Sequence, residues 1–135
     1  MITQAIYDRL SGDGTLAGLL AEYRGRPAVF TTEPAPGDAV LPYIVAAGDV
    51  AQAAFDTKTT RGRTITRDVR CYAAASGSAR TVTAIAERVR HLLHRRALEI
   101  DNFVWVMAEC SGPMAADGQD AYGRIVTVRM VAEEL

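Results

Sequence analysis

Residues 55–72, FDTKTTRGRTITRDVRCY, place the strongest constraint on how this chain can fold. The first half of this stretch is polar, rich in Thr and Arg, and has no core-forming residue after Phe55. In the second half, residues 64–72, side chains alternate between two faces, as in a strand with one packed face. One face carries Ile65, Val69 and Cys71, interrupted by Arg67; the other carries Thr66, Asp68, Arg70 and Tyr72. A long polar loop that runs into a strand is therefore predicted.

Helical periodicity is clearest after Ser78, which is a suitable N-cap. Apolar side chains recur there with helical spacing, at Val82, Ile85, Ala86, Val89, Leu92 and Leu93. Residues 2–10 have a shorter pattern of the same kind, and the glycines near residue 12 should end that helix. Asp13 or Thr15 can then cap a second helix. The sequence thus predicts two helices near the start and a long one after the middle.

Strand patterns occupy much of the rest. Residues 41–47 and 122–131 are predicted strands, and residues 103–110 are so uniformly apolar that a central position is expected. Residues 24–41, rich in Pro and Gly, read as a connector with a short strand at 28–31, and residues 111–121 read as a hairpin loop. We predict a single α+β domain over residues 1–135. Its sheet is mostly antiparallel with about four strands, its helices pack on one side, and the long polar loop joins the first two main strands.

Composition narrows the function classes. The 135 residues suit one domain, and the net charge of −1 gives no general attraction to nucleic acid. Of the 15 Lys and Arg residues, only Lys58 is a lysine. No apolar run approaches the roughly 20 residues of a membrane span, and the start lacks a signal-peptide pattern. A cytoplasmic protein without membrane contact is expected.

No residue pattern indicates catalysis. A zinc site from His91, His94, Cys71 and Cys110 is disfavoured, because the spacing is wrong and arginines crowd the histidines. Nucleophile motifs and phosphate-binding glycine loops are absent. We therefore predict that the chain is no enzyme and has no catalytic, metal-binding or cofactor-binding residue and no cofactor.

The predicted working part is the polar stretch and the arginines that follow it. The candidate partner-binding residues are Phe55, Asp56, Thr57, Lys58, Thr59, Thr60, Arg61, Gly62, Arg63, Arg67 and Arg70. The arginines could form a solvated face, partly neutralised by Asp56 and Asp68, or could meet acidic groups of another subunit; direct DNA contact is a lesser alternative. Phe55 could anchor either the core or an interface.

Several short pieces together resemble a known family. They are residues 41–45 (LPYIV), residues 55–59 (FDTKT) followed by Gly62 and the strand to Tyr72, the helix after Ser78, and residues 122–126 (YGRIV). In this order they are similar to the tail-completion, or tail-terminator, proteins of long-tailed phages, prophages and gene transfer agents. The resemblance extends over nearly the whole chain.

The resemblance implies a structural role in virion assembly. Such proteins form a ring, typically hexameric, which caps the completed tail tube, stops tube polymerisation and joins the tail to the head connector. The implied partners are other copies of the chain, the major tail tube protein and a connector or stopper protein, while DNA only passes through the lumen. The implied location is the bacterial host cytoplasm during assembly and then the head-proximal end of the tail.

Three other readings compete with the tail terminator. The chain could be another connector component, such as an adaptor or stopper. It could be a small ligand-binding or enzyme-like domain, or a nucleic-acid-binding domain. A polar loop of this length is costly to order without a partner, which favours an assembly protein among these classes.

Overall fold

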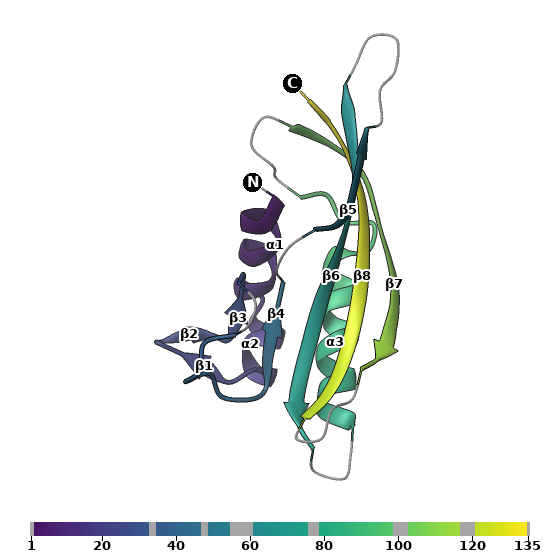
Figure 1. Ribbon diagram of the computed structural model, residues 1–135. Helices are drawn as coiled ribbons and strands as arrows, with labels where there is room; N and C mark the ends of the chain where they lie inside the picture. The colour runs from purple at the N-terminus through teal and green to yellow at the C-terminus, as the bar shows by residue number, and fades with distance from the viewer. Residues whose placement is uncertain are drawn as a thin grey trace.

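Two long strands, β6 (Gly62–Ala74) and β8 (Ala121–Glu134), form the centre of the sheet in a computed structural model of the chain (Figure 1). The structure describes residues 2–32, 35–46, 49–54, 61–75, 79–98, 103–116 and 121–134. All 13 residues of β6 pair with β8, from Gly62 opposite Glu133 to Ala74 opposite Ala121. The predicted strand over residues 64–72 is thus confirmed. The observed strand is longer than predicted by two residues at each end.

The sheet has six described strands in the order β3-β4-β6-β8-β7, with β5 also pairing with β6. Only β3 (Val29–Phe30) and β4 (Tyr43–Val45) pair in parallel, so the predicted, mostly antiparallel α+β sheet is confirmed. β3 and β7 (Phe103–Ala115) are the two ends of this order, and β5 (Asp49–Ala54) is outermost along the first part of β6. A separate hairpin joins β1 (Glu22–Tyr23) to β2 (Arg26–Pro27), and only β2 lies inside residues 24–41, the segment predicted as a connector.

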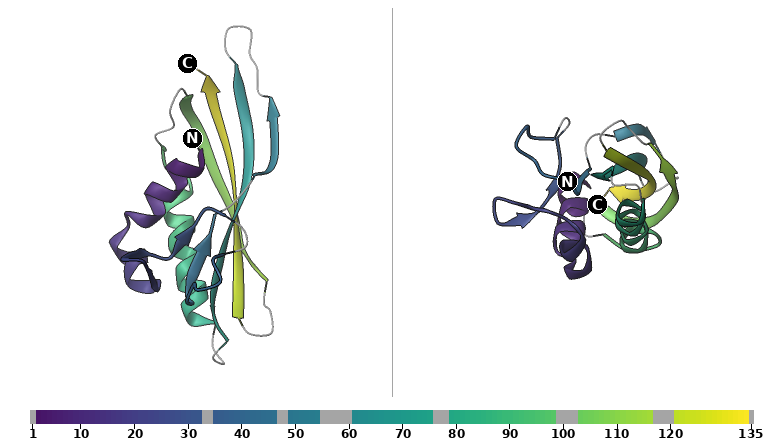
Figure 2. Two further views of the ribbon diagram at one scale, coloured as in Figure 1. Left: turned by 60° about the vertical axis from the view of Figure 1, so that its left-hand side comes forward. Right: turned by 90° about the horizontal axis from the view of Figure 1, so that it is seen from below.

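Three helices lie on one side of the long strands (Figure 2). The helix α3 (Arg80–Leu93) packs on β6, β7 and β8, while α1 (Ile2–Ser11) and α2 (Gly14–Leu19) pack beside it. Five members of the predicted apolar stripe of α3 are buried, and the sixth, Leu92, is only partly buried. The buried five are Val82, Ile85, Ala86, Val89 and Leu93. The helix begins after Ala79, which makes no side-chain cap hydrogen bond. The predicted cap Ser78 lies outside the described residues.

Asp13 resolves the choice of cap for the second helix. Its carboxylate accepts a hydrogen bond from the main-chain N–H of Leu16, 2.9 Å away. The same carboxylate accepts two hydrogen bonds from the Arg88 guanidinium, at 2.9 and 2.8 Å. One side chain therefore caps α2 and ties it to α3 in a bidentate ion pair.

Two predictions about the sheet were wrong. The segment between the first two main strands, predicted as a polar loop from about residue 48 to residue 63, is not all loop, because residues 49–54 form β5 opposite residues 63–67. The apolar strand at residues 103–110 is not central: β7 pairs only with β8 and lies at the margin. It also continues to Ala115, through a stretch predicted as loop. Strand order depends on contacts between distant residues, and an apolar run alone does not report it.

The outer margin of β7 is covered near its middle by the end of α3. The main-chain N–H of Cys110 donates to Nδ1 of His94 at 2.9 Å, and the N–H of Arg95 donates to the Ala108 carbonyl at 2.8 Å. Both contacts satisfy main-chain groups that face away from β8. A covered edge of this kind is closed to pairing with another strand.

Removing the Asp13 carboxylate should destabilise the fold in two separable ways. Asp13→Ala removes the cap and the ion pair, and the lost cap alone should cost about 1 kcal/mol of unfolding free energy. Asp13→Asn keeps a capping oxygen and removes only the charge, so it should cost less. Urea unfolding of both variants at neutral pH measures the difference. Equal stability of Asp13→Ala and the unaltered chain would contradict this role.

The same pair predicts a dependence of stability on acid. The Arg88 hydrogen bonds hold the pKa of Asp13 below its usual value of 3.8. The carboxylate therefore stabilises the fold above that usual value, and this contribution is lost as the pH falls through the lowered pKa. Asp13→Asn should lose less stability than the unaltered chain when urea unfolding is repeated at about pH 3.

His94 should contribute to stability through its ring nitrogen. His94→Ala leaves the Cys110 N–H without its acceptor, which should cost about 1 kcal/mol or more. His94→Asn can place an amide oxygen near the same position and should recover part of the loss. Urea unfolding of the three proteins at neutral pH tests this, and it fails if the Asn and Ala variants are equally unstable.

Candidate functional site

One end of the sheet extends beyond the helices (Figures 1 and 2). It consists of β5, residues 61–67 of the chain that leads into and forms β6, and the paired end of β8. We call residues 49–54 and 61–67 the projecting hairpin. The side chains of Ala53, Ala54 and Arg61 are exposed there.

Six of the predicted partner-binding residues lie outside the described residues: Phe55, Asp56, Thr57, Lys58, Thr59 and Thr60. Their contacts with a partner stay a prediction. The other five lie in β6 or directly before it: Arg61, Gly62, Arg63, Arg67 and Arg70. The structure separates these five into three environments.

Arg61 and Arg63 lie at the projecting end. The Arg61 carbonyl accepts a hydrogen bond from the N–H of Glu134 at 2.7 Å, which extends the β6–β8 pairing past Gly62. Arg63 lies 3.4 Å from the Glu134 carboxylate and 5.6 Å above the ring of Phe103. The guanidinium of Arg63 thus connects the end of β8 to the start of β7, while the Arg61 side chain points into solvent.

Arg67 lies on the packed face. Its side chain is only 5% exposed, and Nη1 donates to the hydroxyl of Thr3 in α1 at 2.6 Å. The residue that interrupts the apolar alternation of β6 therefore contacts a helix of its own chain. Its predicted contact with a partner stays a prediction, and the geometry adds a role in seating α1 against the sheet.

Arg70 lies on the opposite face of β6, half-buried between Val45 of β4 and Ile125 of β8 in the register. Its neighbour on that face, Asp68, accepts a hydrogen bond from the Thr127 hydroxyl at 2.7 Å. The basic cluster of the sequence is therefore not one surface. Arg61 and Arg63 are brought together, whereas Arg67 and Arg70 are not.

The described residues contain no grouping of three or more His, Cys, Asp or Glu side chains that could hold a metal ion. Burial raises the pKa of the Cys71 thiol to about 12 and that of Cys110 to about 11, which disfavours the reactive thiolate. Within the described ranges, no helix has the length and hydropathy that a bilayer-crossing segment requires.

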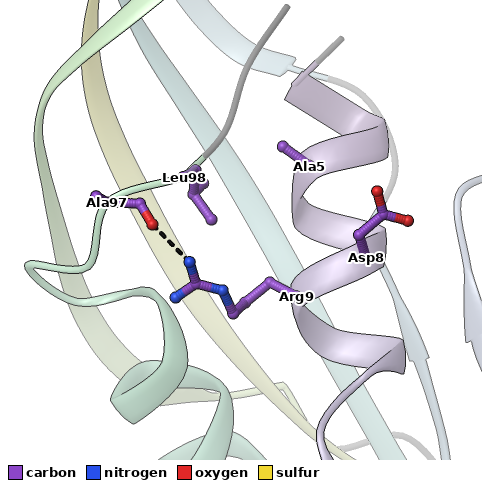
Figure 3. A pocket seen from close by; sticks show the side chains of 5 residues that line it. All are labelled: Ala5, Asp8, Arg9, Ala97 and Leu98. Atoms are coloured by element: carbon purple, nitrogen blue, oxygen red, sulfur yellow. Dashed lines mark hydrogen bonds between the residues drawn. The ribbon is translucent and has the colours of Figure 1, made fainter.

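A pocket lies between α1 and the segment that follows α3 (Figure 3). Its lining includes Ala5, Asp8, Arg9, Ala97 and Leu98. Arg9 donates to the carbonyls of Leu92 at 3.1 Å and Ala97 at 2.5 Å. The guanidinium thus holds α1 to the end of α3, while the Asp8 carboxylate accepts a hydrogen bond from the Gln4 side chain at 2.7 Å.

Sequence reasoning missed an exposed apolar site on β7. Val104 and Val106 are 48% and 39% exposed, at the same end of the sheet as Arg63 and Phe103. These two valines add apolar surface beside an outer strand, and an outer strand invites pairing with another chain. The available signal was the absence of charged residues from 103 to 108, which sequence reasoning had attributed to a central strand.

Comparison with solved structures gives a close match in fold. A chain from the "Virion of native gene transfer agent (GTA) particle" superposes with a TM-score of 0.82 at 22% sequence identity. The match covers 98% of this chain and 94% of that chain. Comparison with curated proteins found no match.

Comparison with protein families gives the assignment. The model described as "Tail completion protein gp17" matches residues 4–133, nearly the whole chain. This confirms the resemblance that the sequence motifs indicated. A family of structural tail proteins also agrees with the prediction that the chain is no enzyme. The chain belongs to the tail completion protein gp17 family.

Proposed function

We propose that this protein forms a ring on the end of a completed tail tube, stops tube polymerisation and presents the surface that joins the tail to the head connector. Membership of the tail completion family supports the general role. The ring, proposed to be a homo-hexamer, would contact the major tail tube protein on one side and a connector or stopper protein on the other. It would be assembled in the bacterial host cytoplasm and remain at the head-proximal end of the tail.

The observation that carries the proposal is the projecting hairpin. β5 and the start of β6 extend past the helices, with Ala53, Ala54 and Arg61 exposed. Residues 62–67 of this hairpin also pair with β8, whereas β5 forms the outer edge of the sheet at this end, and an exposed strand edge invites pairing. A partner protein that binds this end would pair with or cover the exposed edge.

The charges at this end favour a protein partner over DNA. Arg63 is already close to Glu134, and Arg67 is buried against α1. The net charge of the chain is −1. A protein that held DNA tightly would need several free cations on one surface, and its affinity would fall steeply with salt. Arginines that pair with acidic side chains attract DNA less, which suits a lumen through which DNA slides.

The fold of the gene transfer agent particle chain supports the proposed setting. That chain shares this fold over nearly its whole length. The fold therefore occurs in a gene transfer agent virion, which is the kind of particle in which we propose that this chain works. We infer the position in the particle from this likeness and from the family.

Reversing the charges of Lys58, which lies outside the described residues, and of Arg61 in the projecting hairpin should abolish capping without unfolding the protein. In the double variant Lys58→Glu with Arg61→Glu, the exposed Arg61 side chain should change stability by less than about 0.5 kcal/mol. Circular dichroism and thermal melting should therefore match the unaltered chain. Electron microscopy of tubes grown from the major tail protein should show uncapped ends and tubes that continue to lengthen.

Arg26→Glu is the matched control, because Arg26 is an exposed arginine on β2, outside the sheet that carries the projecting hairpin. This variant should cap tubes normally. Normal capping by the Lys58 and Arg61 double variant would contradict the placement of the interface. Binding to connector rings but never to tube ends would instead favour an adaptor or stopper.

A further inference from the structure

The sheet has two open margins at its projecting end. There the strands lie in the order β5-β6-β8-β7, and β5 and β7 are the outermost members (Figure 2, left). In the described structure, β5 pairs only with β6 and β7 only with β8. Each margin therefore presents main-chain N–H and C=O groups to one side.

The margin of β7 is open over a defined length. Cover from α3 reaches Cys110 and Ala108, through His94 and Arg95. No described residue outside the sheet hydrogen-bonds the main chain of residues 103–107. This segment carries no charged residue and no proline, and the register shift at Val106 is its only feature that discourages pairing. Its exposed side chains, Val104 and Val106, are apolar.

The margin of β5 suits a close neighbour. The strand reads DVAQAA, with its one charged residue at the start. The exposed side chains of Ala53 and Ala54 are small, so the main chain of another strand can approach without displacing bulky groups. An apolar margin and a small-residue margin thus occur on the same chain.

The two margins match in height and direction. Ala53 pairs with Thr64, Thr64 with Val131, and Val131 with Met107, so β5 and the open part of β7 lie at one level of the sheet. Three antiparallel steps separate β5 from β7, so these strands run in opposite directions. A copy rotated about an axis parallel to the strands would bring its β5 antiparallel to β7 of the first copy.

We propose that the ring closes by strand pairing between copies of this chain: residues 103–107 of one subunit pair with β5 of the next. The occupant of each margin is a second copy, because head-to-tail contact consumes both margins at once and leaves neither open in a closed ring. Val104 and Val106 are covered at the junction. This inference rests on the proposed ring and adds the surface by which its subunits join.

Engineered cysteines test the pairing. Ala53→Cys on one chain and Val106→Cys on another, co-expressed and oxidised with diamide, should give a disulfide-linked dimer; Val104→Cys tests the neighbouring register. Each single variant alone should stay unlinked. A chain with both Ala53→Cys and Val106→Cys should give a ladder of covalent oligomers up to the ring. The native thiols of Cys71 and Cys110 are buried and serve as an unreactive background.

Ala53→Cys with Met114→Cys is the matched control, because Met114 is an exposed β7 residue at the other end of the strand, opposite Ile125. It should give no ladder. Linked dimers from Val106→Cys alone would overturn the proposal in favour of a two-fold β7 contact, and a ladder from the control pair would overturn it as nonspecific.

Native mass measurement and tube capping separate this inference from the proposed function. Rings that cap tubes but give no link from Ala53 to residues 104 or 106 would overturn the strand pairing and leave the capping function standing. A chain that stays a monomer and leaves tubes uncapped would overturn both.

Discussion

The uninterrupted pairing of β6 with β8 is the constraint on which the rest of the structure depends. It extends from Gly62 opposite Glu133 to Ala74 opposite Ala121. Such a pair is longer than the helix that packs on it, since α3 ends at Leu93 after 14 residues with a rise of about 1.5 Å each, against about 3.4 Å per strand residue. α3 therefore covers only about half the length of the β6–β8 pair, and the projecting end of this pair lies beyond α3 (Figure 1).

Arg67 lies on the packed face of β6, in register with Asp49 at the start of β5. A buried guanidinium is costly unless its donors are satisfied, and Thr3 of α1 supplies one acceptor. The position of α1 is thereby linked to the strand that leads to the projecting end. Arg63, which lies four residues before Arg67 in β6, lies near Glu134 instead. Neighbouring arginines of one sequence cluster thus serve the fold and the surface separately.

The sequence patterns correctly predicted the features of the fold that depend on residues close together in the chain. The stripe of α3, the two faces of β6 and the capping potential of Asp13 all depend on residues within a few positions of each other. The marginal place of β7 does not, because it follows from the order in which distant strands pair. β5 was missed because alanine-rich DVAQAA has weak strand propensity and becomes a strand only beside β6. Because strand order is not visible in a local pattern, the exposed valines of β7 were predicted to lie in the core.

Joining subunits by strand margins has a consequence for the family. Pairing of this kind uses main-chain N–H and C=O groups, which every residue except proline supplies in full. Side chains at the junction need only be small or apolar, as Ala53 and Val106 are, so many sequences satisfy the requirement. Under the proposed pairing, selection preserves the shape and direction of the margins more than residue identity.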